Sequence, residues 1–115
     1  MKKKYIPHRG DILWLNFDPI LGKEISKRRP ALVLSPKEYN QYGKAIVVPI
    51  TSQEKGYPFE VKINQEGVKG VVLVDSVRSV DWIEREAKFI CSSSSATFSE
   101  VLKKLASLLI RNPLV

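Results

Sequence analysis

Short apolar runs, separated by polar residues and turn formers, follow one another along most of the chain. They are rich in Val and Ile, and runs of this length and spacing are typical of strands in a small barrel or sandwich. The runs cover Ile12–Phe17, Ala31–Leu34, Ala45–Ile50, Phe59–Ile63, Gly70–Val74, Val77–Ile83 and Ala87–Cys91. We therefore expect a mainly β fold with a strand in each run.

The details of these runs indicate how the strands are covered. Phe59–Ile63 alternates strictly between apolar and polar residues, as a strand with one solvated face does. The other runs are more continuously apolar, which indicates strands covered on both faces. Pro49 has no N–H for a sheet ladder, so we expect it at a strand edge or end, with Thr51 near an exposed rim.

The pattern changes to a helical period after a run of serines, Ser92–Ser95, which we expect to be a connecting loop. Thr97 and Glu100 fit a capping box, with Thr97 as the N-cap residue. Asn112 and Pro113 are a stop signal. The helix between these signals carries an apolar stripe that we expect to pack on the barrel, formed by Val101, Leu102, Leu105, Leu108 and Leu109.

The composition bounds the function. The chain has 115 residues, 43% of them hydrophobic, and neither a repeat nor a linker is visible, so we expect a single domain over residues 1–115. Its formal charge is +7, and residues 1–30 alone hold eight Lys and Arg against three acids. Such a basic region attracts phosphate or an acidic partner, although excess Lys also serves solubility.

The single cysteine, Cys91, and the single histidine, His8, cannot form a zinc cluster or an intrachain disulfide. We therefore expect no metal and no cofactor, and a place in the reducing cytoplasm. Lys2–Lys4 is not followed by an apolar signal region, and no apolar stretch is long enough to cross a bilayer, so neither export nor membrane insertion is expected.

One polar cluster precedes a buried run. Arg29 stands before Pro30, which forces an extended backbone and fixes the direction of the arginine. Neighbouring side chains in an extended chain point to opposite faces, so only one of Arg28 and Arg29 is expected to reach a given pocket. For Lys27 and Arg28 we favour a solvated basic loop.

Polar residues also follow two other apolar runs. Thr51, Ser52 and Gln53 end the third run, where a hydroxyl is more often a turn former than a catalytic group. Asp75 and Arg78 follow Val71–Val74 and form either a polar site or a structural ion pair. The two tryptophans, which can stack on nucleotide bases, are more often core or interface residues. They are Trp14 and Trp82.

Taken in order, the short polar motifs resemble the MazF/PemK (Kid) family of toxin endoribonucleases from bacterial toxin–antitoxin pairs. The resemblance covers nearly the whole chain and is specific through the order and spacing of its pieces. These are Arg9–Ile12, Phe17–Pro19, Gly22–Glu24, Arg29–Ser35, Pro49–Thr51, Gly70–Leu73 and Asp75–Val80.

The resemblance implies an SH3-like β-barrel with a C-terminal α-helix, a homodimer, and cleavage of single-stranded RNA without a metal. It assigns Arg29 and Thr51 to the scissile phosphate, and Glu24 to the family's loop glutamate. Asp75 matches an acid assigned to catalysis in the PemK branch. The arginine that precedes it by two residues in that branch is Leu73 here, which favours an assignment centred on Arg29 and Thr51 and leaves Asp75 a candidate for catalysis or RNA binding.

In such an enzyme the RNA's own 2′-hydroxyl is the nucleophile, and it leaves a 2′,3′-cyclic phosphate and a 5′-hydroxyl. The base for its proton is Glu24 or Asp75, and the sequence does not choose between them. Base-specific contacts are expected from Lys27, Arg28, Ser52, Gln53 and Arg78.

The family also implies a cognate MazE-like antitoxin with an acidic tail, which a basic groove suits electrostatically. Two rival readings are a CcdB-type protein that poisons DNA gyrase without catalysis, and an SH3-like module that binds RNA and leaves it intact.

Overall fold

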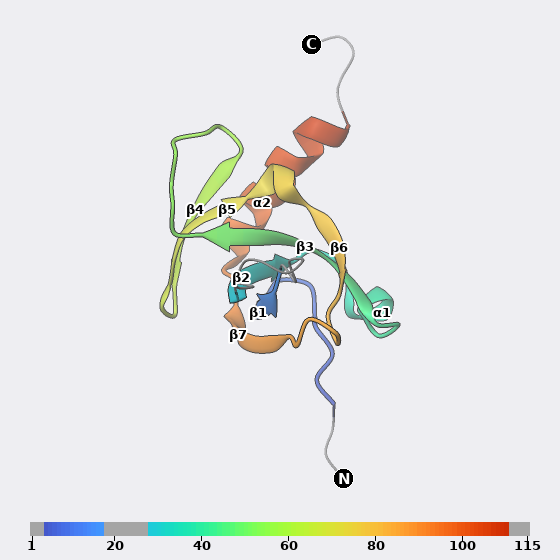
Figure 1. Ribbon diagram of the computed structural model, residues 1–115. Helices are drawn as coiled ribbons and strands as arrows, with labels where there is room; N and C mark the ends of the chain where they lie inside the picture. Colours follow the sequence, from blue (N-terminus) through green and yellow to red (C-terminus); the bar gives the residue numbers. More distant parts are fainter. Residues whose placement is uncertain (1–3, 18–27, 111–115) are drawn as a thin grey trace, which may run out of the picture.

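A computed structural model describes residues 4–17 and 28–110 of the protein, which form a strongly curled sheet with a helix at the C-terminal end (Figure 1). Each of the seven apolar runs forms a strand within a few residues of the predicted bounds. The strands are β1 (Asp11–Asn16), β2 (Arg28–Val33), β3 (Lys44–Thr51), β4 (Glu60–Gln65), β5 (Val68–Leu73), β6 (Arg78–Asp81) and β7 (Lys88–Ser92). The helical elements are α1 (Lys37–Asn40), the 3₁₀ turn η1 (Val74–Ser76) and α2 (Ser95–Leu109).

Strand β3 is the centre of the sheet, because three other strands pair with it. All the pairings are antiparallel, and the strand order is β4-β5-β3-β2-β1-β7, with β6 also paired to β3. The first part of β3 pairs with β2 on one side and with β6 on the other. Its end, Ile50 and Thr51, pairs with β5 instead. This change of partner bends the sheet into a half-barrel, so the predicted mainly β barrel with a C-terminal helix is confirmed.

Two hydrophobic clusters cover the two faces of the central strands. One contains Ile12, Leu32 and Val48 together with residues of β4, β5 and α2. The other contains Leu13, Val33 and Val47 on the opposite side of the same strands. The prediction of strands covered on both faces is therefore confirmed for β1, β2 and β3. It is wrong for β6 and β7, which leave most of their residues at least partly exposed.

Pro49 lies inside β3 and not at its end. It falls between Val47, the last residue paired with β6, and Ile50, the first paired with β5. On this edge of β3 neither β6 nor β5 pairs with Pro49, while on the other edge it is opposite Ala31 of β2. Thr51, as expected, is the last residue of β3 and is only partly covered.

Helix α2 begins earlier than the capping box predicted. Its N-cap is Ser94, whose hydroxyl accepts a hydrogen bond from the Thr97 N–H at 3.1 Å. The Gln65 side chain of β4 accepts from the Ser94 N–H and donates to the Ser92 carbonyl, which fixes the chain just before the helix. The prediction of Thr97 as N-cap and of a loop over all four serines is therefore wrong. The sequence around the serines carries no sign of this contact with Gln65 of β4.

The apolar stripe of α2 is only partly packed. Val101 and Leu105 are buried in the first cluster, with Phe98 against it, as predicted. Leu102, Leu108 and Leu109 are exposed, and Leu109 retains 70% of its surface. For Leu108 and Leu109 the reason is that the last turns of α2 extend past the sheet (Figure 1). The stop signal at Asn112 and Pro113 lies outside the described residues. None of the helices in the described ranges is long and apolar enough to cross a membrane.

The helix cap gives a direct test of this geometry. We expect Ser94→Ala to lower the free energy of unfolding by about 1 kcal/mol, because the Thr97 N–H loses its acceptor. Thr97→Ala removes no cap acceptor and is expected to cost less than about 0.5 kcal/mol. Urea unfolding followed by circular dichroism measures both free energies of unfolding. A larger loss of stability for Thr97→Ala than for Ser94→Ala would support Thr97 as the N-cap residue.

Candidate active site

A groove of about 710 Å³ opens where β3 changes partners. Beyond the pair Ala31 and Pro49 the ladder between β2 and β3 ends, while β3 continues toward β5. The two strands therefore diverge, and the space between them remains open. The groove is lined by Trp14, Arg28, Arg29, Pro30, Ile50, Thr51, Ser52, Gln53, Glu66, Gly67, Val68, Lys69 and Ile90.

Arg29 and Thr51 both line this groove. Ala31, opposite Pro49, is the last residue of β2 in the ladder with β3, so Arg29 and Thr51 each lie two residues beyond that pair, on the diverging ends of the two strands. Residues two apart on a strand share a face. Two residues far apart in sequence thus border the same cavity.

The hydroxyl of Thr51 is oriented by its own turn. Its Oγ1 accepts a hydrogen bond from the Gln53 N–H at 3.2 Å. A threonine hydroxyl carries one hydrogen and two lone pairs, so this contact leaves the O–H available as a donor. The turn that sequence reasoning gave as the commoner role of Thr51 is therefore present, and it also holds the hydroxyl at the groove.

Gly70 of β5 packs directly on the backbone of Thr51. Its φ is +144°, and a Cβ at this position would come within 2.0 Å of the Thr51 carbonyl oxygen and 2.9 Å of the Ser52 Cα. Both contacts are to backbone atoms, which cannot rotate away. A glycine is therefore required for β5 to approach the end of β3 this closely.

The opposite wall of the groove is the tight turn between β4 and β5. Its two central residues, Glu66 and Gly67, both have positive φ, as a type I′ hairpin turn requires. Lys69 follows on the wall. Three cations and one acid therefore line the described part of the groove, which favours an anionic ligand.

Trp14 contributes an aromatic surface. Its side chain is 38% exposed and lines the groove, so of the two roles favoured from the sequence, core or interface, the core role does not apply to this residue. The register of β1 and β2 explains the exposure, because Trp14 is opposite Pro30, near the point where the β2–β3 ladder ends. Trp82, by contrast, packs against the second cluster and donates to the Asn40 carbonyl, as a core tryptophan should.

Arg28 and Arg29 both line the groove, so the expectation that only one of them reaches a given pocket is wrong. The groove lies past the end of the β2–β3 ladder, where residues of both faces border it. The Arg28 guanidinium donates to Asn16 Oδ1 at 2.9 Å and to the Glu86 carbonyl at 2.6 Å. Among the described residues, none of the hydrogen bonds or ion pairs engages the Arg29 side chain.

The remaining candidates are distributed differently. Ser52 and Gln53 line the groove, whereas Glu24 and Lys27 lie outside the described residues. Arg78 is not among the groove residues, and its guanidinium carbon lies 5.5 Å from the centre of the Phe17 ring.

Asp75 lies in a second pocket, of about 610 Å³, which shares Thr51 and Gln53 with the groove. Its carboxylate accepts a hydrogen bond from the Tyr57 hydroxyl at 2.9 Å, and this bond is the main cause of a raised Tyr57 pKa. Within the described part of the chain it forms no ion pair with Arg78, so of the two alternatives left open by the sequence the structural pair is absent there.

Comparison with known proteins identifies the family. A family model for the PemK-like, MazF-like toxin of type II toxin–antitoxin systems matches residues 8–109. The chain belongs to this family. It is 47% identical over 88 residues to the endoribonuclease toxin MazF of Escherichia coli K12, and this alignment covers 76% of this chain and 79% of that protein. It is 39% identical over 111 residues to the endoribonuclease toxin ChpB of the same organism, across 91% of this chain and 96% of ChpB.

Solved structures of the family have the same fold. A crystal structure of the MazE–MazF complex from Deinococcus radiodurans superimposes with a TM-score of 0.89 at 47% identity, and covers 95% of this chain and 100% of that one. A crystal structure of MazF from the same organism gives 0.84 at 48% identity, across 92% and 98%. The resemblance read from the short motifs is therefore confirmed.

Sequence reasoning assigned no functional role to several residues at the groove and the second pocket. Lys69 lines the groove and Tyr57 the second pocket, and neither was singled out from the sequence. Gly70 appeared there only within an apolar run and a family motif, and Trp14 only as a residue able to stack on bases. A positive φ at Gly70 cannot be read from one sequence, although an isolated glycine inside a strand pattern is a general signal of close backbone approach.

The contact between Gly70 and Thr51 predicts a specific loss of stability. Gly43, on a turn remote from the groove, also has a positive φ, +106°, but a Cβ there would meet nothing within 4 Å. We expect Gly70→Ala to lower the free energy of unfolding by about 1–3 kcal/mol more than Gly43→Ala, because only the first adds a steric clash to the backbone strain. Urea unfolding compares the two variants, and equal losses would contradict the close approach.

Proposed function

We propose that this protein is an endoribonuclease toxin that cuts single-stranded RNA at short sequences without a metal ion, and so inhibits translation and growth. The observation that carries this proposal is that Arg29 and Thr51, each two residues beyond the last β2–β3 pair, line the same basic groove. The names of the relatives MazF and ChpB support the same activity.

The groove offers the donors that a phosphate needs. Arg29 is planar and always charged, and its guanidinium can donate two parallel hydrogen bonds to phosphate oxygens. The Thr51 hydroxyl supplies one further donor, because its turn contact uses only a lone pair. Donors fixed before the reaction stabilise the charge that grows on the phosphorane in the transition state.

The reaction follows from RNA chemistry. The 2′-oxygen attacks phosphorus, the bond to the 5′-oxygen breaks, and a 2′,3′-cyclic phosphate and a 5′-hydroxyl result. One base must take the 2′-proton and one acid must protonate the leaving oxygen. Glu24 and Asp75 are the candidate bases, and of these Asp75 lies in the second pocket, next to Thr51.

The shape and chemistry of the groove suit a single strand and not a duplex. Trp14 presents an aromatic surface on which an unpaired base can stack, and stacked bases expose their edges for reading. We expect Arg28, Ser52 and Gln53 to contact the RNA, since all three line the groove. We also propose RNA contacts from Arg78, which does not line the groove, and from Lys27, which lies outside the described residues.

The comparisons favour this function over the two rivals. A gyrase poison or a simple RNA-binding module has no need for an arginine and a hydroxyl converging on one phosphate position. The relatives named above carry the name endoribonuclease. An RNA-binding module predicts salt-sensitive binding with the strand left intact, so the experiment below separates it from an enzyme.

The central test is RNA cleavage in excess EDTA. We expect Arg29→Ala to lower kcat/KM at least about 100-fold, on the scale measured for loss of one transition-state donor. Arg29→Lys retains the charge but lacks the two parallel N–H donors of a guanidinium, so we expect an intermediate loss of kcat/KM. Cleavage of an unstructured RNA, followed by chemical typing of the fragment ends, measures both.

Lys37→Ala is the matched control, because Lys37 is an exposed cation on α1 outside the groove and its removal lowers the net charge by the same amount. Near-native cleavage by Arg29→Ala, or a loss equal to that of Lys37→Ala, would discard the assignment. Fragments without cyclic phosphate ends would discard attack by the 2′-hydroxyl.

We further propose a cytoplasmic homodimer that a cognate MazE-like antitoxin inhibits. The solved structure of a MazE–MazF complex supports such a partner. The described part of the groove carries three cations against Glu66, so an acidic antitoxin tail would suit it electrostatically.

An acidic tail and RNA are expected to compete for one groove. Adding the antitoxin should therefore raise the apparent KM for RNA in proportion to its concentration, and higher salt should weaken both interactions. Steady-state kinetics at several antitoxin concentrations test this. Simultaneous binding of both molecules with undiminished cleavage would place the antitoxin elsewhere.

A further inference from the structure

The second pocket is a built feature of the fold beside the groove that holds Arg29 and Thr51. It lies across the Thr51–Gln53 segment from the groove, and both residues line the two cavities. Its volume of about 610 Å³ is within the range of small-ligand sites. A strand whose phosphate is held at Thr51 would have its neighbouring nucleotide at the entrance of this pocket.

An aromatic ring forms one side of the pocket. The Tyr57 side chain is 47% exposed, so one part of the ring is open to a ligand. Phe59 supports it from behind with its ring centre 5.7 Å away and the planes at 64°. The Tyr57 hydroxyl donates to Asp75 Oδ2, which fixes the rotation of the ring. A supported, exposed ring of this kind is a stacking platform for a base.

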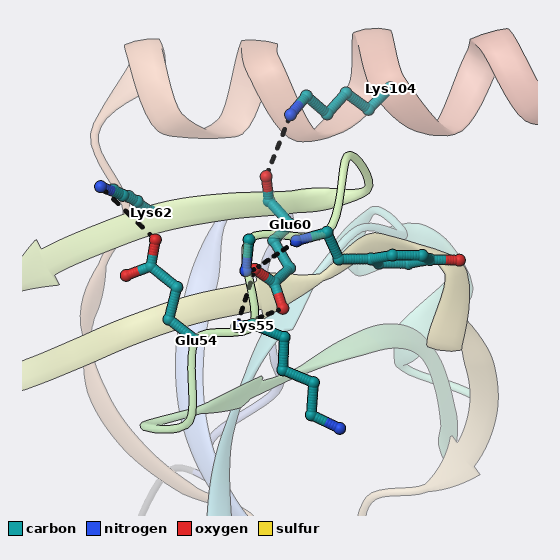
Figure 2. A network of polar contacts seen from close by, with 7 residues as sticks. Glu54, Lys55, Glu60, Lys62 and Lys104 are labelled. Carbon is teal, nitrogen blue, oxygen red and sulfur yellow. Dashed lines mark hydrogen bonds and ion pairs between the residues drawn. The ribbon is translucent and has the colours of Figure 1, made fainter.

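The segment that carries Tyr57 is held in place from two directions (Figure 2). The Glu60 carboxylate accepts hydrogen bonds from the N–H groups of Lys55, Gly56 and Tyr57 at 3.1–3.3 Å. Lys104 of α2 donates to the carbonyls of Pro58 and Glu60 at 2.9 and 3.0 Å. Charged groups bonded to several backbone positions order a loop strongly. The platform is therefore organised before any ligand arrives.

The hydrogen-bonding group beside this ring is the carboxylate of Asp75, which only accepts. Tyr57 uses one lone pair of Oδ2, so both oxygens can accept further bonds. Guanine presents two adjacent N–H donors, N1–H and N2–H, on its Watson–Crick edge and so can bond both oxygens. Uracil presents one N–H between two carbonyl oxygens, which the carboxylate repels. Gln53 and Lys55 bring donors for the base's own acceptors.

We propose that the second pocket is a base-reading subsite, in which a guanine next to the cleaved phosphate stacks on Tyr57 and donates two hydrogen bonds to Asp75. Asp75 is then a specificity residue and not the general base. Glu60 and Lys104 are positioning residues that hold the stacking platform. This inference rests on the proposed ribonuclease function, which supplies the strand beside the pocket.

Cleavage of an RNA pool with a randomised segment, followed by sequencing of the cut sites, tests the subsite. The native protein should prefer guanine at one position next to the cut. Asp75→Asn should lose that preference, while the best-cleaved sequences are still cut. Tyr57→Ala should raise KM about tenfold at little change in kcat, the scale of one lost base stack.

Matched controls are Glu38→Gln, which removes an exposed carboxylate on α1, and Tyr42→Ala, which removes an exposed ring on the turn after α1. Neither should alter the preference or KM. The proposal is overturned if Asp75→Asn stops cleavage of every sequence alike, which would make Asp75 a catalytic base. Unchanged preference and unchanged KM in both pocket variants would also overturn it.

A binding measurement separates this inference from the proposed function. Uridine oligonucleotides made with 2′-methoxy sugars cannot be cut, and fluorescence anisotropy gives their Kd with and without one guanosine. The native protein should bind the guanosine form more tightly, and Asp75→Asn should remove the difference. A native protein that cuts no RNA but shows this difference refutes the nuclease and supports the subsite. Equal affinities refute the subsite whether or not RNA is cut.

Discussion

The structure depends on one close contact, the approach of β5 to the end of β3 at Gly70 and Thr51. Because Gly70 has no Cβ, β5 can pair with Ile50 and Thr51 after β3 has left β2. This change of partner curls the sheet and leaves the groove open between β2 and the β4–β5 turn. The same contact fixes the backbone of Thr51, so fold and site share a single constraint.

The arrangement separates two tasks that an RNA-cutting site must perform. In the proposed function Arg29 and Thr51, which line one groove, bind the phosphate, which is the same in every nucleotide. Tyr57 and Asp75, on the far side of the Thr51–Gln53 segment, face a pocket suited to a base. Rigid strands carry the first pair, while a loop fastened by Glu60 and Lys104 carries the tyrosine (Figure 2). Sequence preference can therefore change without disturbing the phosphate site.

The strands were predictable because their apolar runs are bounded by clear turn signals, and the family because its short motifs occur in a fixed order. The sequence also pointed to Arg29, since Pro30 restricts the residue before it. It failed where distant contacts decide the outcome. Gln65 sets the start of α2 at Ser94, and the end of the β2–β3 ladder exposes Trp14. Tyr57 bonds to the Asp75 carboxylate, for which the sequence had left a polar site and an ion pair with Arg78 as alternatives. Local patterns carry no information on such contacts.

The most direct measurement of the account is a double-mutant cycle on kcat/KM for RNA cleavage, with Arg29→Ala, Thr51→Ala and the double variant. When two residues act on the same group, removing the second after the first lowers kcat/KM little further. When they act independently, the free-energy losses of the two single variants add in the double variant. The account predicts that the double variant loses much less than the product of the two single losses, because one phosphate receives both side chains. A loss equal to that product would contradict a shared phosphate and the site built around it.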